Sequence, residues 1–184
     1  MKMGENDPAK RVTLTVGYDK NNVYIYVAGE ATMMIASTLK KFIFDIVGQF
    51  ESATEHNIFI NLSDCKYMDS TFIGTLIIVE KKCVDILSKH ILISKPSIYC
   101  EEVLQNMGLL KVFTITEEMP VSENIHLTEL IMRDIDRLEN AILMFQAHEE
   151  LSNVSQENKK QFKLVTETLK KEIEKEQKKR NENG

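Results

Sequence analysis

The segment that decides the fold is Ile58-Phe-Ile-Asn-Leu-Ser-Asp-Cys-Lys-Tyr-Met-Asp-Ser-Thr-Phe-Ile-Gly-Thr-Leu76. It opens with a short apolar run, residues 58–60, which is typical of a strand buried inside a sheet and would continue to Leu62. The polar stretch 63–69 predicts a loop, and the apolar-rich stretch from about Ser70 to Ser88 predicts a helix. The segment therefore predicts a strand, a loop and a helix in succession, the unit from which α/β folds are built.

The start of this helix carries the main candidate site. Asp69 and Ser70 both have side chains suited to capping a helix, and apolar residues begin only after them. The first amide N–H groups of a helix lack partners within it and present partial positive charge, so the fold would tolerate a phosphate on Ser70. Such a phosphate would add about −2 of charge beside Asp69 and would block a docked partner without unfolding the chain. A plain helix cap at Ser70 would give the same sequence pattern, so both interpretations stay open at this point.

The residues before this segment predict a β-hairpin and a helix. Residues 12–16 alternate apolar and polar side chains, residues 19–22 have turn chemistry, and residues 23–27 are rich in β-branched and aromatic side chains. From about Met34 to Phe50 apolar residues recur at three- and four-residue steps, which predicts an amphipathic helix.

The residues after it continue the alternation. Residues 91–93 predict a strand, Ser97 opens a third helix that Gly108 would end, and residues 112–115 predict a last short strand. Strands that alternate with helices after an opening hairpin predict an α/β fold, a mixed sheet flanked by helices. Pro120 ends this pattern.

Beyond Pro120 the pattern is helical. Residues 123–150 predict one long helix, a break follows near residues 152–158, and a second helix covers about 156–180, so a C-terminal helical hairpin is expected. The apolar stripe of the first helix consists of Leu127, Ile131, Ile135, Leu138, Ile142 and Phe145. We therefore divide the chain into a flexible N-terminus (1–10), a sheet domain (11–119) and a hairpin extension (120–184). The stripe either packs on the hairpin partner or on the sheet domain, which we favour, or forms a homodimer seam or a partner's docking face.

Composition narrows the class of partner and the compartment. A net charge of −5 and a pI near 5.5 argue against nucleic-acid binding, which needs a concentrated basic face. The three cysteines are widely spaced and form no CxxC pair, so we expect free thiols in a reducing cytosol. Residues 1–10 lack the apolar core of a signal peptide, and the most apolar stretch, 72–79, is far shorter than the ~20 residues that cross a bilayer. We expect a cytoplasmic protein with no membrane association.

Catalytic and metal-binding patterns are weak. His56, His90, His126 and His148 are scattered without ligand-like spacing, and we expect each at a surface or boundary position. There is no Gly-rich phosphate loop, GxSxG elbow or HExxH motif. Cys65 lies near Ser70 and is expected to be an inert, partly buried thiol. We therefore predict a protein that is not an enzyme and that holds no metal and no cofactor.

The run 58–76 resembles the signature of STAS domains, the anti-sigma factor antagonist family. The usual form is an apolar strand, then Asp-Leu-Ser, a spacer, and Met-Asp-Ser-Ser/Thr-Gly-Leu-Gly. The resemblance extends to Gly29-Glu30 before the first helix, and to residues 92–97, 107–110 and Phe113 after the second. It covers about residues 10–118, and it implies a STAS-like mixed sheet flanked by helices.

The resemblance also implies a function. In that family the serine after the motif aspartate is phosphorylated by an anti-sigma factor that is a serine kinase. Only the unphosphorylated form binds that kinase, and this binding frees the sigma factor that controls transcription. A PP2C-type phosphatase removes the phosphate and so resets the switch. By position the aspartate is Asp69, the phosphoacceptor is Ser70 and Thr71 is a secondary acceptor. Together with Phe72 these residues would form the partner-binding surface.

Three residues depart from the family pattern. Phe72 stands where glycine is usual and would make the first helical turn bulkier, while Thr32 and Asn61 replace usual aspartates. We expect a phosphorylation-gated protein-binding module whose partner is not the best-known one. The alternative is a constitutive scaffold or oligomerisation protein, in which Ser70 is only a helix N-cap.

Overall fold

The computed structural model describes residues 12–50, 56–120, 125–132 and 134–182. The strands within these ranges are β1 (Thr13–Tyr18), β2 (Asn22–Ala31), β3 (Asn57–Asn61), β4 (Cys65–Met68), β5 (Leu92–Ser94), β6 (Thr114–Thr116) and β7 (Thr128–Glu129). The helices are α1 (Met33–Val47), α2 (Ser70–Leu87), α3 (Ile98–Asn106), the 3-10 turn η1 (Leu109–Lys111), α4 (Arg137–Ser152) and α5 (Gln156–Glu182). The N-terminal residues 1–10, for which flexibility is predicted, lie outside the described residues.

The strands form one mixed sheet in the order β6-β5-β3-β2-β1-β7, with β4 paired to the far end of β2. The hairpin β1–β2 is antiparallel, whereas the β2–β3, β3–β5 and β5–β6 pairs are parallel. The carboxylate of Asp19 accepts hydrogen bonds from the amides of Asn21 and Asn22 and so closes the hairpin turn. The predicted α/β class with a mixed sheet is confirmed.

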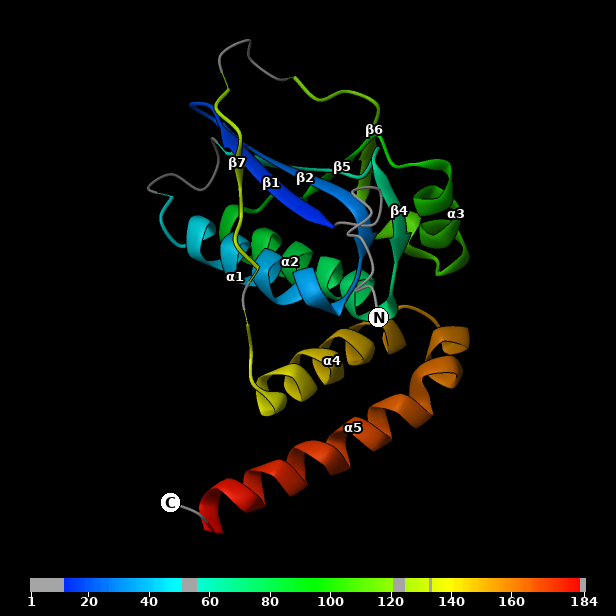
Figure 1. Cartoon of the computed structure of the whole chain (residues 1–184). Helices are drawn as coiled ribbons and strands as arrows, with labels where there is room; N and C mark the ends of the chain where they lie inside the picture. Colours follow the sequence, from blue (N-terminus) through cyan, green and yellow to red (C-terminus); the bar gives the residue numbers. More distant parts are fainter. Residues whose placement is uncertain (1–11, 51–55, 121–124, 133, 183–184) are drawn as a thin grey trace, which may run out of the picture.

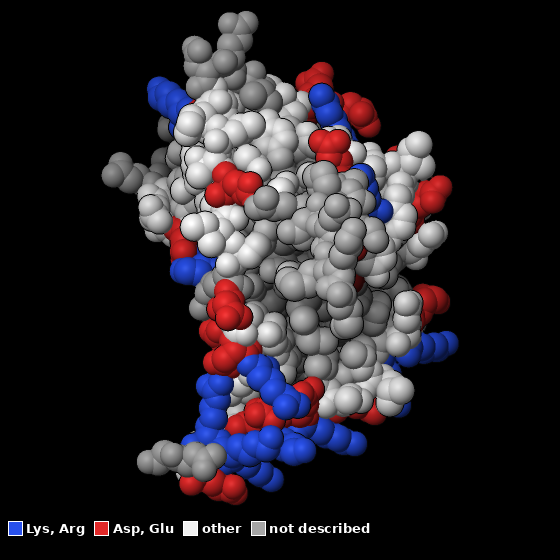
Figure 2. Space-filling model, viewed as in Figure 1, with Lys and Arg blue, Asp and Glu red and all other residues white. Residues whose placement is uncertain are grey.

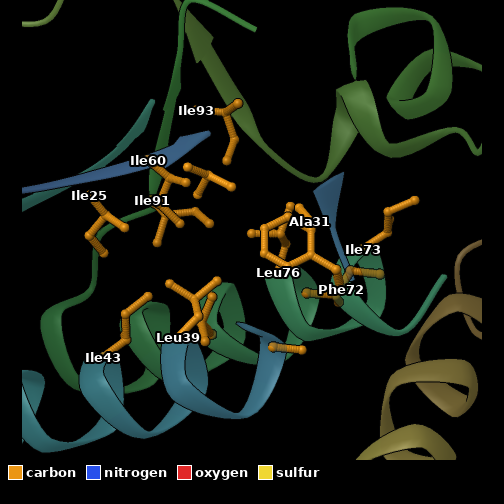
Figure 3. Close-up of a cluster of buried hydrophobic side chains, with 14 of the residues drawn as sticks. Ile25, Ala31, Leu39, Ile43, Ile60, Phe72, Ile73, Leu76, Ile91 and Ile93 are labelled. Atoms are coloured by element: carbon orange, nitrogen blue, oxygen red, sulfur yellow. The ribbon is translucent and has the colours of Figure 1, made fainter. Parts of the chain in front are cut away.

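Helices α1 and α2 cover one face of this sheet and enclose the core between them and the strands (Figure 1). Figure 3 shows side chains from both layers meeting there. The labelled strand and helix residues Ile25, Ile60, Ile93, Leu39, Ile43, Phe72 and Leu76 are all fully buried. Their periodicity, two along the strands and three to four along the helices, is what makes these elements predictable.

Two elements differ from the sequence prediction. The stretch 63–69 contains a strand, β4, because residues 65–68 pair with the end of β2, where Asp69 also donates its amide to the carbonyl of Ala31. The long helix predicted over 123–150 is wrong in its first half, although residues 123, 124 and 133 lie outside the described residues. Helix α4 begins only at Arg137.

The segment before α4 returns to the sheet. Thr128 pairs with Val16 and Glu129 with Thr15, so β7 covers the free edge of β1. The amide of Leu130 then donates to the carbonyl of Leu14 over 2.8 Å. This pairing satisfies backbone groups of β1 that would otherwise be left at a bare edge, which outweighs the helical spacing of the apolar residues.

The C-terminal hairpin is a further pair of layers on the helical side of the sheet domain. In Figure 1, α4 lies beneath α2, and α5 lies beneath α4. Helix α4 packs within the chain, as favoured, but the predicted apolar stripe is wrong as its buried face. Leu127 and Ile131 are exposed, and the other four stripe residues, Ile135, Leu138, Ile142 and Phe145, are only half-buried. The face that α4 buries includes Leu143, Ala147 and Leu151 instead. The charged side chains of α5 gather at the outer end of the molecule in Figure 2. The division of the chain at residues 119 and 120 stays a prediction, as does a homodimer through these helices.

Candidate functional site

Asp69, rather than Ser70, is the N-cap of α2. Its Oδ1 accepts a hydrogen bond from the Phe72 amide over 2.7 Å, and its Oδ2 accepts one from the Met33 amide, at the start of α1, over 2.8 Å. One carboxylate therefore satisfies an amide at the start of each helix, where partial positive charge concentrates. Ser70 is the first helical residue, so the expectation that it could be the N-cap is wrong, while the alternative of a constitutive scaffold stays a prediction.

The hydroxyl group of Ser70 instead contacts α4. Its Oγ lies 2.8 Å from Nε2 of His148. Nδ1 of the same ring lies 2.7 Å from the carbonyl oxygen of Met144, which can only accept a hydrogen bond, so Nδ1 carries a proton. In the neutral imidazole Nε2 is then the acceptor and Ser70 the donor.

His148 is held from several sides. Only 4% of the residue is exposed, and its ring packs at a tilt against Phe162 of α5, with 5.5 Å between the ring centroids. The prediction of a surface or boundary position for His148 is wrong, because the fold places it between α2 and α5. This histidine connects the candidate switch serine to the C-terminal hairpin.

The crossing of α2 and α4 is unusually close one turn beyond Ser70. A Cβ atom at Gly74 would lie 2.2 Å from the carbonyl oxygen of Ala147, 2.5 Å from its carbonyl carbon and 2.7 Å from its Cα. Only glycine fits at this position while α4 is seated. The side chain of Lys81, farther along α2, forms an ion pair with Glu150. These contacts fix the separation of the two helices near Ser70.

The other two predicted contact residues point inward. Phe72 is 0% exposed and belongs to the core, so the expectation that its ring crowds the surface of the first turn is wrong. Its side chain offers no surface to a partner in this arrangement. Thr71 is 4% exposed, which leaves its hydroxyl no access for modification while the fold is intact. Of the four predicted residues, Asp69 and Ser70 are the ones that remain partly exposed.

The departures from the family pattern have structural roles. Thr32 is the N-cap of α1, and its side chain accepts a hydrogen bond from the Met34 amide. Oδ1 of Asn61 accepts a hydrogen bond from the Ser63 amide over 2.9 Å at the end of β3. Both side chains therefore make local hydrogen bonds that an aspartate would also make.

The three cysteine thiols differ in character: Cys65 and Cys83 have a raised pKa, whereas hydrogen bonds with Cys65 and Ser97 lower the pKa of Cys100 to about 7. All three are free and buried, as expected for Cys65, which lies in β4 rather than in a loop. A hydrogen bond with the Cys100 thiol, together with burial, raises the pKa of Cys65, and burial raises the pKa of Cys83 to about 12. A thiol with a raised pKa carries little of the reactive thiolate at neutral pH.

Within the described ranges no group of three or more histidine, cysteine, aspartate or glutamate side chains is placed to hold a metal ion. Across those same residues, no helix has the length and apolar character that crossing a bilayer requires.

Solved structures of similar fold exist for the sheet domain, although no protein-family profile and no curated protein matches the chain. The solved structure of the anti-sigma factor antagonist SpoIIAA in its unphosphorylated form is similar, with a TM-score of 0.48 and 19% identity over 57% of this chain and 89% of that chain. The Bacillus cell fate determinant SpoIIAA in its phosphorylated form gives a TM-score of 0.45 and 19% identity over 57% and 92%. The NMR structure of the protein TM1081 gives 0.48 and 20% over 63% and 84%.

The expected likeness to anti-sigma factor antagonists is found among the solved structures, at 19% identity and with TM-scores of 0.48 and 0.45. These matches cover between 57% and 63% of the chain.

Proposed function

We propose that this chain is a phosphorylation-gated protein-binding module, in which the unmodified Ser70 region binds a protein partner and a phosphate on Ser70 ends that binding. The observation that carries the proposal is the division of roles between two neighbouring side chains. Asp69 caps α2, which leaves the Ser70 hydroxyl free of any duty within its own helix and turned toward a separate segment. A hydroxyl in this position can be modified without unfolding the helix.

Physical chemistry gives the modification its effect. A phosphate on Ser70 would bring about −2 of charge and three acceptor oxygens to the start of α2. The helix end tolerates an anion, but the adjacent Asp69 carboxylate and any seated partner do not. The charge and the volume of the phosphate would prevent the partner from binding, while the core around Phe72 stays intact.

The sequence resemblance supports a choice of partner class. By that resemblance the partner is a serine kinase of the anti-sigma factor kind, and a PP2C-type phosphatase removes the phosphate, in the cytoplasm. The chain itself acts by binding rather than by catalysis. The partner-contacting residues are Asp69 and Ser70 in the fold described, with Thr71 and Phe72 behind them.

The proposal is tested on protein isolated from its native cell. Phosphopeptide analysis should find phosphate on Ser70, and a pull-down should recover a partner with Ser70→Ala but lose it with Ser70→Asp. Ser63→Asp is the matched control, because Ser63 is exposed in the connection between β3 and β4 and should keep the partner. Absence of phosphate, together with equal recovery by the alanine and aspartate variants, would overturn the proposal.

A further inference from the structure

The surface of α2 that carries Ser70 is already occupied by a helix of the same chain. We define the Ser70 face as Ser70, Gly74 and Lys81, which lie on one stripe of α2 at helical spacing. Each contacts α4: Ser70 bonds to His148, Gly74 touches Ala147, and Lys81 pairs with Glu150. A surface that makes one hydrogen bond, one close backbone crossing and one ion pair is shaped for a helix.

The residues of α4 that lie opposite Ser70, Gly74 and Lys81 show which side chains this surface can bind. Opposite Gly74 the crossing allows only a small residue to bring the backbones into contact, and α4 supplies Ala147. Opposite Ser70 it supplies a hydrogen-bond acceptor, and opposite Lys81 it supplies a carboxylate. Leu143 and Leu151 complete the buried side of α4.

Helix α4 packs more closely against α2 than against α1. Against α2 it is tight, but against α1 it leaves a hollow of about 450 Å³ lined by apolar and charged side chains, among them Phe44, Ile135, Leu143 and Lys40. The hollow is a groove open at the surface rather than an enclosed void. A polar contact, from Lys40 Nζ to Gln146 Oε1 over 2.8 Å, crosses between α1 and α4 beside the hollow.

We propose that the Ser70 face is a docking surface for a helix of the binding partner, and that α4 occupies it in the free protein as a tethered competitor. This rests on the proposed function, because it names the partner's binding element and the regulation of the same site. The partner helix presents alanine, glycine or serine opposite Gly74, an acceptor opposite Ser70 and an acidic side chain opposite Lys81. It binds only when the α4–α5 hairpin lifts.

The same geometry excludes phosphate from the closed form. The Ser70 oxygen and the His148 nitrogen are already at hydrogen-bond distance, so a phosphate on Ser70 would have to displace the His148 ring. The close Gly74–Ala147 crossing one turn away holds the helices at their present separation, which leaves the ring little space to move aside. Seating of α4 and modification of Ser70 are therefore alternatives. A kinase reaches Ser70 only in the open form, and the modified form cannot reseat α4.

The probe for the docking surface is a fluorescent synthetic peptide of residues 136–153, which carries α4 in its native sequence. It is titrated by anisotropy into the full chain and into two full-length opened variants, Ala147→Glu and Leu151→Asp. Hydrogen exchange of residues 137–152 measures whether α4 has lifted. The opened variants should bind the peptide at least about tenfold more tightly than the wild-type chain, because a tethered competitor acts at millimolar effective concentration.

Specificity is tested by adding Gly74→Ala to each opened variant, which places a methyl group where the Ala147 backbone must come. This should weaken peptide binding at least about tenfold. Gly48→Ala is the matched control, since the nearest atoms to a Cβ there belong to the preceding turn of its own helix. Three outcomes overturn the proposal: α4 stays protected in both opened variants, the lifted chains do not bind the peptide, or Gly74→Ala leaves binding unchanged. Absence of phosphate on Ser70, together with equal partner recovery by the alanine and aspartate variants, would defeat the proposed function and leave these results unaffected.

Discussion

The sheet domain and the C-terminal hairpin differ in how they are held. In the sheet domain, side chains from β2, β3, α1 and α2 meet in one core and are almost fully buried. Leu143, Leu151 and Phe162 of the hairpin add to the edge of this core. In the hairpin, α5 is 27 residues long, yet its buried residues are Asn158, Phe162 and Leu169. The hairpin is thus fastened mainly through one side of α4, and its outer surface is charged (Figure 2).

Because they are held differently, the sheet domain and the C-terminal hairpin should unfold locally at different free energies. Regions with few buried apolar contacts open locally, while a central core opens only with the whole domain. Ser70 lies between the two regions, because its helix, α2, is part of the sheet-domain core and its hydroxyl group contacts His148 of the hairpin. A switch at this border can move the hairpin without disturbing the sheet.

The largest effect is expected in the sheet domain. Phe72→Ala removes a fully buried ring from the core and should lower the free energy of unfolding of the whole domain by about 3–5 kcal/mol. Urea denaturation followed by circular dichroism measures this. Tyr67→Ala is the comparison, because 44% of that residue is exposed and its loss should cost much less. Equal costs would show that Phe72 is not a core residue.

A smaller and local effect is expected in the hairpin. Leu151→Ala should weaken the docking of α4 by about 2–5 kcal/mol, because Leu151 is fully buried at the end of α4. Hydrogen exchange should then speed up in α4 and stay unchanged in β2 and β3. Leu164→Ala, on the exposed side of α5, should change neither. Loss of protection in the strands together with α4 would mean that the two regions form one cooperative unit.

The smallest effect is expected for the ion pair at the rim. Lys81→Ala should weaken α4 docking by no more than about 1 kcal/mol, because the lysine side chain is 56% exposed and the pair is screened by salt. A double-mutant cycle with Glu150→Ala, run at low and high salt, isolates the coupling between the two charges. A coupling that is large and independent of salt would contradict the account of this contact.

Most of the sheet domain can be predicted from the sequence. Periodicity two in residues 12–16 and periodicity three to four in residues 34–50 mark the face that each element buries, and burial decides the pairing. The sequence predicts that α2 begins near residue 70 but not which residue caps it, since Asp69 and Ser70 have equally suitable side chains. Only the position of the Met33 amide, 36 residues away along the chain, gives Asp69 its second bond.

The C-terminal segment is harder to predict for a physical reason. Leu127, Ile131 and Ile135 keep helical spacing, but the free edge of β1 is a long-range feature that spacing does not record. A local signal does exist: Asp136 caps α4 by accepting hydrogen bonds from the amides of Leu138 and Glu139. The role of His148 cannot be found from sequence, because its contact with Ser70 spans 78 residues.

The central claim is that the state of Ser70 decides whether α4 stays seated, and hydrogen exchange of α4 tests it most directly. Full-length Ser70→Asp and Ser70→Ala are compared under identical conditions, reading residues 137–152 and the strands separately. Ser70→Asp should exchange at least about tenfold faster in α4 than Ser70→Ala, since its carboxylate would be forced into a contact already closed, while the strands stay protected. Equal exchange in the two variants, or slower exchange in Ser70→Asp because His148 clamps the anion, would contradict the account.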